Sequence, residues 1–181
     1  SALYVKSFTI PATSLVKAIA VKPGQLSSGI VEATVKVYLP MKAQMVGKTV
    51  PGLQYKYVEA ADLNTDKVIA AAATRTGITP TFTTTVKERT DKYGLVFTGY
   101  FQQDKQSMVE FFTSSDDGSL LYIDNELIVD NNGRHGMEER SGKAFLAMGW
   151  HSIKVVYYDG GGGNGLKVSY KVEGGEKKEI P

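Results

Sequence analysis

Residues 93–123 read YGLVFTGYFQQDKQSMVEFFTSSDDGSLLYI, and this stretch predicts the fold. It contains three runs rich in β-branched and aromatic residues, at 95–101, 107–113 and 119–123, separated by short polar segments. Turn signals recur about every 8–12 residues from here onward, which is typical of an all-β antiparallel sandwich or barrel. The later strand signals lie at 127–129, 143–147, 151–158 and 166–172.

The residues before this stretch divide into shorter segments. Residues 15–21 and 30–38 have strand patterns on either side of the turn dipeptide Pro23-Gly24. Residues 40–51 have no clean period and are bracketed by prolines, which predicts a linker. A further strand is expected at 53–58, a helix is compatible with 62–73, and Asp124-Asn125 predicts a tight hairpin turn. We therefore expect a β fragment at 1–39, a linker at 40–51 and a β domain at 52–181.

Composition excludes several classes of function. The chain has 181 residues, enough for one domain with its own core plus a fragment. Lys and Arg number 21 against 19 Asp and Glu, and this near balance argues against nucleic-acid binding. No apolar run approaches the roughly 18 residues that a membrane-spanning helix needs. The absence of cysteine excludes thiolate metal sites and cysteine nucleophiles.

The most distinctive polar motif is the acidic pair Asp116-Asp117, which precedes Gly118. Adjacent side chains on a regular strand point to opposite faces, so the pair meets at one cation only if the backbone kinks, for example through a cis peptide. Calcium is the cation that suits such oxygen ligands. The alternative is a turn in which one Asp accepts backbone N–H groups, and the residues alone favour that turn without excluding calcium.

Two later loops are also rich in polar residues and glycine. Residues 130–136 read DNNGRHG, and a lone histidine such as His135 is more often structural than a metal ligand. Only one other histidine, His151, is present, which argues against zinc. Residues 160–165 read GGGGNG and follow a strand. They lack the Lys-Ser/Thr of a phosphate loop, so a hairpin loop is expected, whose exposed carbonyls would also suit calcium or a sugar hydroxyl.

Signals for catalysis are weak. No nucleophile elbow occurs, and the spacing of the carboxylates does not define a glycosidase-type pair. Trp150 stands at a strand start, where core packing and a sugar-stacking surface are both open, with packing the commoner role. The carboxylates that offer a catalytic pair are Asp116, Asp117, Asp124, Asp130, Glu138 and Glu139.

A longer match gives these motifs a context. The runs GLVFTGYF, FFTSSDDGSLLYIDNELIVDNNGRHG and SGKAFLAMGWHSIKVVYYDGGGGNGLKVSY occur in this order between residues 94 and 170. Together they resemble the protective-antigen-type (PA-fourteen) domain family over about residues 52–175. Members of this family are β-sandwiches or barrels found in secreted glycosidases, glycosyltransferases, adhesins and toxins. This sequence departs from the usual pattern at Asn125, where glycine is common, and at Lys105-Gln106.

The resemblance implies a binding site. In the fungal adhesin branch two adjacent Asp residues, joined by a cis peptide, hold a calcium ion that bridges to sugar hydroxyls. Asp116 and Asp117 occupy this position, and Asn164 is the nearest match to an Asn that completes the site. The resemblance therefore implies calcium as a cofactor, with Asp116, Asp117 and Asn164 as metal ligands. The residues expected to bind carbohydrate are Asp116, Asp117, His135, Gly162, Gly163 and Asn164.

The first 38 residues carry a second, partial resemblance. The KAIA run, the Pro-Gly turn and the VEAT run resemble the latter half of the small C-terminal β domain of bacterial β-hexosaminidases and chitobiases. This implies a C-terminal piece of a longer secreted, periplasmic or cell-surface glycoside hydrolase. We expect a non-catalytic carbohydrate-binding accessory module, with glycans and an upstream catalytic domain as partners. The alternative is a structural or protein-interaction spacer without a ligand.

Overall fold

The structure is a computed structural model that describes residues 3–180. Its contacts divide the chain into two units, Ser1–Leu39 and Pro40–Pro181. Residues 1, 2 and 181, which fall within the predicted segments 1–39 and 52–181, lie outside the described part of the chain.

The first unit contains an antiparallel pair of strands, β1 (Ser14–Ala18) and β2 (Val31–Val35). Gly24, with φ of 75°, follows Pro23 in the connection, and the N–H of Gln25 donates to the carbonyl of Lys22. This confirms the predicted Pro-Gly turn, because a glycine with positive φ after proline is typical of a type II turn. Both strands are shorter than the sequence pattern predicted, and most of their side chains are exposed.

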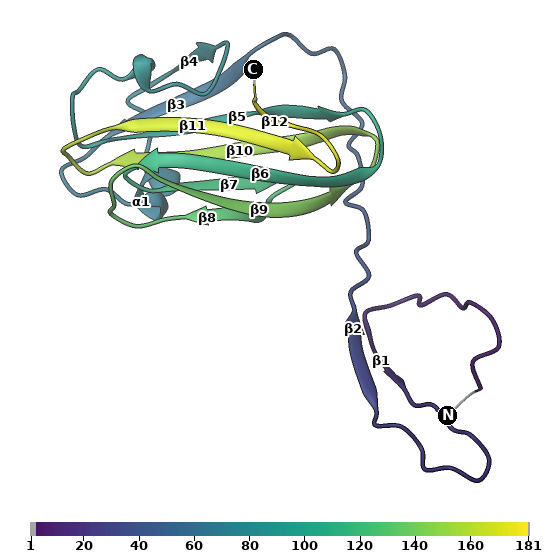
Figure 1. Cartoon of the computed structure of the whole chain (residues 1–181). Helices are drawn as coiled ribbons and strands as arrows, with labels where there is room; N and C mark the ends of the chain where they lie inside the picture. The colour runs from purple at the N-terminus through teal and green to yellow at the C-terminus, as the bar shows by residue number, and fades with distance from the viewer. Residues whose placement is uncertain (1–2, 181) are drawn as a thin grey trace. The chain divides into compact units, whose positions relative to one another are not determined.

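The second unit is an antiparallel β-sandwich of two sheets (Figure 1). This confirms the predicted all-β class and selects the sandwich, because the sheets do not close into a barrel. The larger sheet has the order β4-β3-β5-β10-β7-β8 and the smaller β12-β11-β6-β9. The strands are β3 (Leu53–Glu59), β4 (Arg75–Thr79), β5 (Tyr93–Gln103), β6 (Ser107–Asp116), β7 (Ser119–Ile123), β8 (Glu126–Asn131), β9 (Glu138–Leu146), β10 (Gly149–Asp159), β11 (Gly165–Val172) and β12 (Lys177–Glu179).

The main core fills the space between the two sheets. Strand β6 shows why: its residues alternate between buried and half-buried along the whole strand, so one face packs inward. Aromatic rings dominate this core, and Phe101 makes edge-to-face contacts with Phe111 and Tyr170 from the opposite sheet. These contacts set the distance between the two sheets. They thereby also set the positions of the strand ends from which the loops extend.

A second, smaller core lies on the outer face of the larger sheet beneath α1 (Thr65–Ala70). Asn64 caps this helix by accepting a hydrogen bond from the N–H of Lys67. Val68 packs directly over Gly94, where any Cβ would overlap it. The helix covers only part of the outer face, and the rest of that face stays open.

The predicted strands and helix are present, with changed bounds. The helix expected at 62–73 is confined to Thr65–Ala70, and β9 begins five residues before the predicted 143–147. The early part of β9 is charged and exposed, so it lacks the alternating apolar residues from which a strand is predicted. Three elements were not predicted: β4, β12 and the short 3-10 helix η1 (Thr84–Val86).

The predicted tight turn at Asp124-Asn125 is confirmed, with φ values of 49° and 68° between β7 and β8. Asp124 also fixes the segment predicted as a linker, because its Oδ1 accepts a 2.6 Å hydrogen bond from the amide of Gln44. Gln44 and Met41 form β-bridges to Trp150 and Leu146. Residues 41–44 are therefore bonded to the sandwich.

Three loops lie together at one end of the sandwich, at the left in Figure 1. They are the β6–β7 turn, the β8–β9 loop and the β10–β11 loop. Within residues 3–180, no helix is long and apolar enough to cross a membrane.

Candidate functional site

The acidic pair lies in the turn between β6 and β7. Asp116 is the last residue of β6, and the peptide bond that joins it to Asp117 is cis. Gly118 follows, where a Cβ would lie 2.6 Å from the ring of Tyr158 and 2.7 Å from the carbonyl oxygen of Gly133. Only glycine fits this position, because the turn lies in close contact with the β8–β9 loop and with Tyr158.

Asp117 connects all three loops. Its side chain is buried, with 3% of its surface exposed. Oδ1 accepts a 3.2 Å hydrogen bond from the backbone N–H of His135 in the β8–β9 loop. Oδ2 accepts a 2.7 Å hydrogen bond from the backbone N–H of Gly160 in the β10–β11 loop. The carboxylate is therefore held in one orientation by two backbone donors. Each of its oxygens accepts one of these hydrogen bonds and keeps a second lone pair.

Asp116 is less buried and lies against residues 160–164 of the β10–β11 loop, called the glycine loop below. Its backbone carbonyl accepts a 2.6 Å hydrogen bond from the Tyr157 hydroxyl, which fixes the end of β6. A Cβ on Gly163 would lie 2.5 Å from Oδ2 of Asp116, so the glycine allows the loop backbone to approach the carboxylate. Burial raises the pKa of Tyr157 well above its usual range, so this hydroxyl keeps its proton and remains a donor.

The glycine loop is held by cationic side chains on both sides. Arg134 donates from Nη2 to the carbonyl oxygen of Gly160 at 3.2 Å. Lys87, which follows η1, donates from Nζ to Oδ1 of Asn164 at 2.7 Å. Gly161 and Gly162 have φ values of 119° and 109°, which favour glycine. The Asn164 amide oxygen is thus already engaged by a lysine.

His135 contributes its backbone to the site, while its ring binds within its own loop. Nδ1 lies 2.8 Å from the carbonyl oxygen of Gly136, and Nε2 lies 3.1 Å from that of Asn131. Burial alone would lower the pKa of His135, but the two carbonyls and the charge of Glu138 together outweigh it, so the pKa is raised. Two acceptors require two N–H donors, which only the protonated ring supplies.

A third carboxylate, Asp159, lies beneath the glycine loop. Its side chain has no exposed surface, and Oδ1 accepts a 2.6 Å hydrogen bond from the N–H of Gly161. Oδ2 has no hydrogen-bond partner among residues 3–180. Burial raises the pKa of Asp159 and the Gly161 N–H opposes this, while the charges of Asp91 and Asp117 raise the pKa further. Asp91, Asp117 and Asp159 therefore lie close enough to affect one another at this end of the sandwich, beside the cations Lys87 and Arg134.

The described residues fit calcium only if backbone oxygens take part. Among residues 3–180, no group of three His, Asp or Glu side chains is arranged to hold a metal ion. Calcium accepts carbonyl oxygens as well as carboxylates, and the glycine loop brings its backbone against Asp116. Among residues 3–180, Oδ2 of Asp159 is a further carboxylate oxygen without a hydrogen-bond partner beneath this loop.

The structure brings some of the predicted residues together. Asp117 meets His135 through the His135 backbone N–H, and Asp116 meets Gly163. Gly162 lies exposed in the same loop, whereas the side chain of Asn164 binds Lys87. The residues that surround them were not predicted from the sequence. Lys87, Asp91, Arg134, Tyr157 and Asp159 were not singled out, and only Arg134 and Asp159 had a signal, because they lie within or beside the loops noted.

Residues 49–181 match the sequence model of the PA14 domain. The chain belongs to the PA14 domain family. No curated protein sequence matches this chain. The family assignment agrees with the predicted protective-antigen-type domain at about 52–175.

Solved structures show the same PA14 fold. The PA14 sugar-binding domain from an RTX adhesin is 20% identical, with a TM-score of 0.63 over 73% of this chain and 96% of that chain. An anti-sigma factor domain-containing protein is 23% identical, with a TM-score of 0.63. The match covers 73% of this chain and 46% of that chain, so this chain spans less than half of that protein's length. A subtype-switched epithelial adhesin A domain from Candida glabrata, in complex with β-lactose, is 8% identical. Its TM-score is 0.59, and the match covers 80% of this chain and 91% of that chain.

Proposed function

We propose that this chain carries a non-catalytic carbohydrate-binding module whose binding surface is the three-loop end of the sandwich. The observation that carries this proposal is the position of Asp117, whose carboxylate joins the β6–β7 turn to both the β8–β9 loop and the glycine loop. The sugar-binding adhesin domain and the lactose-bound adhesin domain, which share the fold, support the same class of ligand.

In this proposal Asp116 and Asp117 hold calcium, with oxygens of the glycine loop, including Asn164, as further ligands. Bound calcium would supply coordination positions in which neighbouring sugar hydroxyls replace water. Asp116 provides the more accessible carboxylate, and the exposed tip at Gly162 and Gly163 offers backbone groups to the sugar. His135 fixes the orientation of Asp117 through its N–H.

The setting that we propose is a secreted, periplasmic or cell-surface glycoside hydrolase related to β-hexosaminidases. The basis is the partial resemblance of residues 1–38 to the C-terminal domain of those enzymes. The module would then act beside a catalytic domain of the same polypeptide. A weak site for single sugars gains affinity for a glycan when it is tethered in this way.

A second candidate is a spacer that binds no ligand. It is favoured by the hydrogen bonds already made: both oxygens of Asp117 accept backbone N–H groups, and Asn164 is bound by Lys87. In a spacer these contacts would serve only to connect the loops. The two candidates differ in whether calcium and sugars stabilise the protein.

A glycan array probed in calcium and in a calcium chelator tests the proposal. We expect the wild type to bind a subset of glycans in calcium only, and Asp116→Asn to lose that binding. Asp104→Asn, which changes an exposed aspartate in the turn after β5, is the control and should bind as the wild type does. Equal signals for the wild type and Asp116→Asn, or none on any glycan, would favour the spacer.

A further inference from the structure

A cavity of about 460 Å³ lies on the outer face of the larger sheet, beyond the part that α1 covers. Its floor is formed by β5 and β10, where Tyr100 lies opposite Ser152 and Thr98 lies opposite Lys154. Lys154 lies five residues before Asp159 on β10, and Ser152 lies seven before it. At about 3.4 Å per residue, the cavity is roughly 20 Å from the acidic pair's end of the sandwich.

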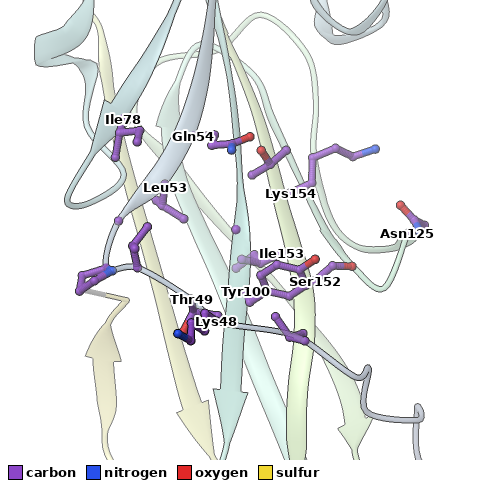
Figure 2. A pocket seen from close by; sticks show the side chains of 16 residues that line it. Lys48, Thr49, Leu53, Gln54, Ile78, Tyr100, Asn125, Ser152, Ile153 and Lys154 are labelled. Carbon is purple, nitrogen blue, oxygen red and sulfur yellow. The ribbon is translucent and has the colours of Figure 1, made fainter.

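One wall of the cavity is the segment 45–52, which crosses the strands (Figure 2). Gln44 anchors its start through the β-bridge to Trp150 and a 3.2 Å hydrogen bond to the Ser152 hydroxyl. Its far end enters β3 at Leu53, after Gly52 with φ of 112°. A segment fixed at both ends gives a wall that is already in place before a ligand binds.

The lining combines an aromatic ring, hydrogen-bonding groups and apolar surface. Tyr100 is 48% exposed, so its ring is accessible from the cavity. Gln54 and Asn125 contribute amides from opposite sides, as Figure 2 shows, and Thr98 and Ser152 contribute hydroxyls. A sugar ring has the matching surfaces, because its C–H face packs on an aromatic ring while its hydroxyls bond to amides.

The charge of the cavity has one sign. Among residues 3–180, Lys48 and Lys154 are the charged residues that line it, and no carboxylate does. None of the ion pairs formed within residues 3–180 includes either lysine. The Nζ of Lys154 lies 4.2 Å from the centre of the Tyr122 ring, on the side of β10 that faces β7. An anionic ligand is the complementary partner.

We propose that this cavity is a second binding site, specific for an acidic saccharide such as a hexuronate. The sugar ring lies against Tyr100, the carboxylate is bound by Lys154, and Gln54 and Asn125 bond to the hydroxyls. A second cavity of about 530 Å³ adjoins it, sharing Tyr100 and Val50, and is also lined by Trp150. This site is independent of calcium.

The test is an amide NMR titration of the 15N-labelled chain with sodium glucuronate, and with glucose as the neutral match, in the presence of a calcium chelator. Glucuronate should shift the amides of residues 98–100 and 152–154 saturably at millimolar concentration. Tyr100→Ala and Lys154→Gln should each weaken binding by about tenfold or more. Lys178→Gln, an exposed lysine on β12, should bind as the wild type does.

The same titration on Asp117→Asn separates this proposal from the function proposed above. The second site should bind glucuronate unchanged in that variant. The second site is overturned if no saturable shift occurs at 98–100 and 152–154, or if Tyr100→Ala and Lys154→Gln both bind as tightly as the wild type. Equal affinity for glucose would overturn the assignment to acidic sugars.

Discussion

The carboxylate of Asp117 accepts a 2.7 Å hydrogen bond from the backbone N–H of Gly160, 43 residues further along the chain. With the second bond from the N–H of His135, one buried side chain holds three loops in register. A charged acceptor binds backbone donors more strongly than a neutral one. The stability of this end of the sandwich should therefore depend on the charge of Asp117.

Asp117→Asn should lower the free energy of unfolding by about 1–3 kcal/mol. The substitution removes the charge and leaves an amide group facing one of the two backbone N–H donors. Urea unfolding measures the change, and Asp104→Asn is the exposed control, expected within about 0.5 kcal/mol of the wild type. Equal losses in the two variants would show that Asp117 does not hold the loops.

Gly118→Ala tests the close contact between the β6–β7 turn and the β8–β9 loop. The added Cβ would lie 2.6 Å from Tyr158 and 2.7 Å from the backbone of Gly133, so we expect a loss of about 1–3 kcal/mol. Gly136→Ala is the matched control, because no atom lies within 4 Å of the Cβ that it would add. In thermal unfolding, Gly118→Ala should melt at a lower temperature than Gly136→Ala. A Gly118→Ala variant as stable as the control would contradict the described geometry.

Asp159→Asn should stabilise the calcium-free protein at neutral pH. Its carboxylate is buried, one oxygen has no partner, and its pKa is raised above the ordinary 3.8. A raised pKa in the folded state means that wild-type stability is lost as the pH rises from 3.8 through that pKa. At pH values above the raised pKa, Asp159→Asn should therefore have a free energy of unfolding about 0.5–2 kcal/mol higher than that of the wild type. This difference should vanish below pH 3.8.

The check is urea unfolding of the wild type and Asp159→Asn at acidic and neutral pH. Asp66→Asn, at an exposed position in α1, serves as the control. A variant less stable than the wild type at neutral pH would mean that the Asp159 carboxylate is stabilised by its surroundings, contrary to the contacts described.

His135 predicts a second pH effect near neutrality. Its pKa in the folded state is raised above 6.5, so the stability that the protonated ring contributes is fully present below 6.5 and is lost as the pH rises through the raised value. Hydrogen exchange of the amides in residues 130–136 should therefore accelerate, relative to the intrinsic rates, as the pH rises from about 6 to 8. His135→Gln should remove this dependence, and a dependence that persists in the variant would exclude His135 as its source.

Much of the fold could be predicted from local patterns. The strands around residues 95–123 and 151–172 carry β-branched and aromatic residues at alternating positions, and they form the centre of both sheets. Elements without such a pattern were missed. Lys177–Glu179 is entirely charged and becomes a strand only because it pairs with β11, a partner that local sequence does not indicate.

The candidate site could be predicted only in part, for a similar reason. Asp116 and Asp117 are visible as a motif, and the glycine loop as a run of residues. Lys87 reaches Asn164 from a segment 77 residues earlier, and no local signal marks it. The open cavity on the outer sheet could not be predicted either, because its lining comes from four strands, the crossing segment 45–52 and the β7–β8 turn.

The most direct test of the central proposal is isothermal titration of calcium into the chelator-treated wild type and into Asp116→Asn, followed by titration with a glycan that the array identifies. We predict saturable binding of one calcium ion by the wild type, its loss in Asp116→Asn, and heat from the sugar only in the calcium-loaded wild type. An absence of calcium heat in the wild type, or the same heat in both proteins, would contradict a calcium-dependent sugar site at Asp116 and Asp117.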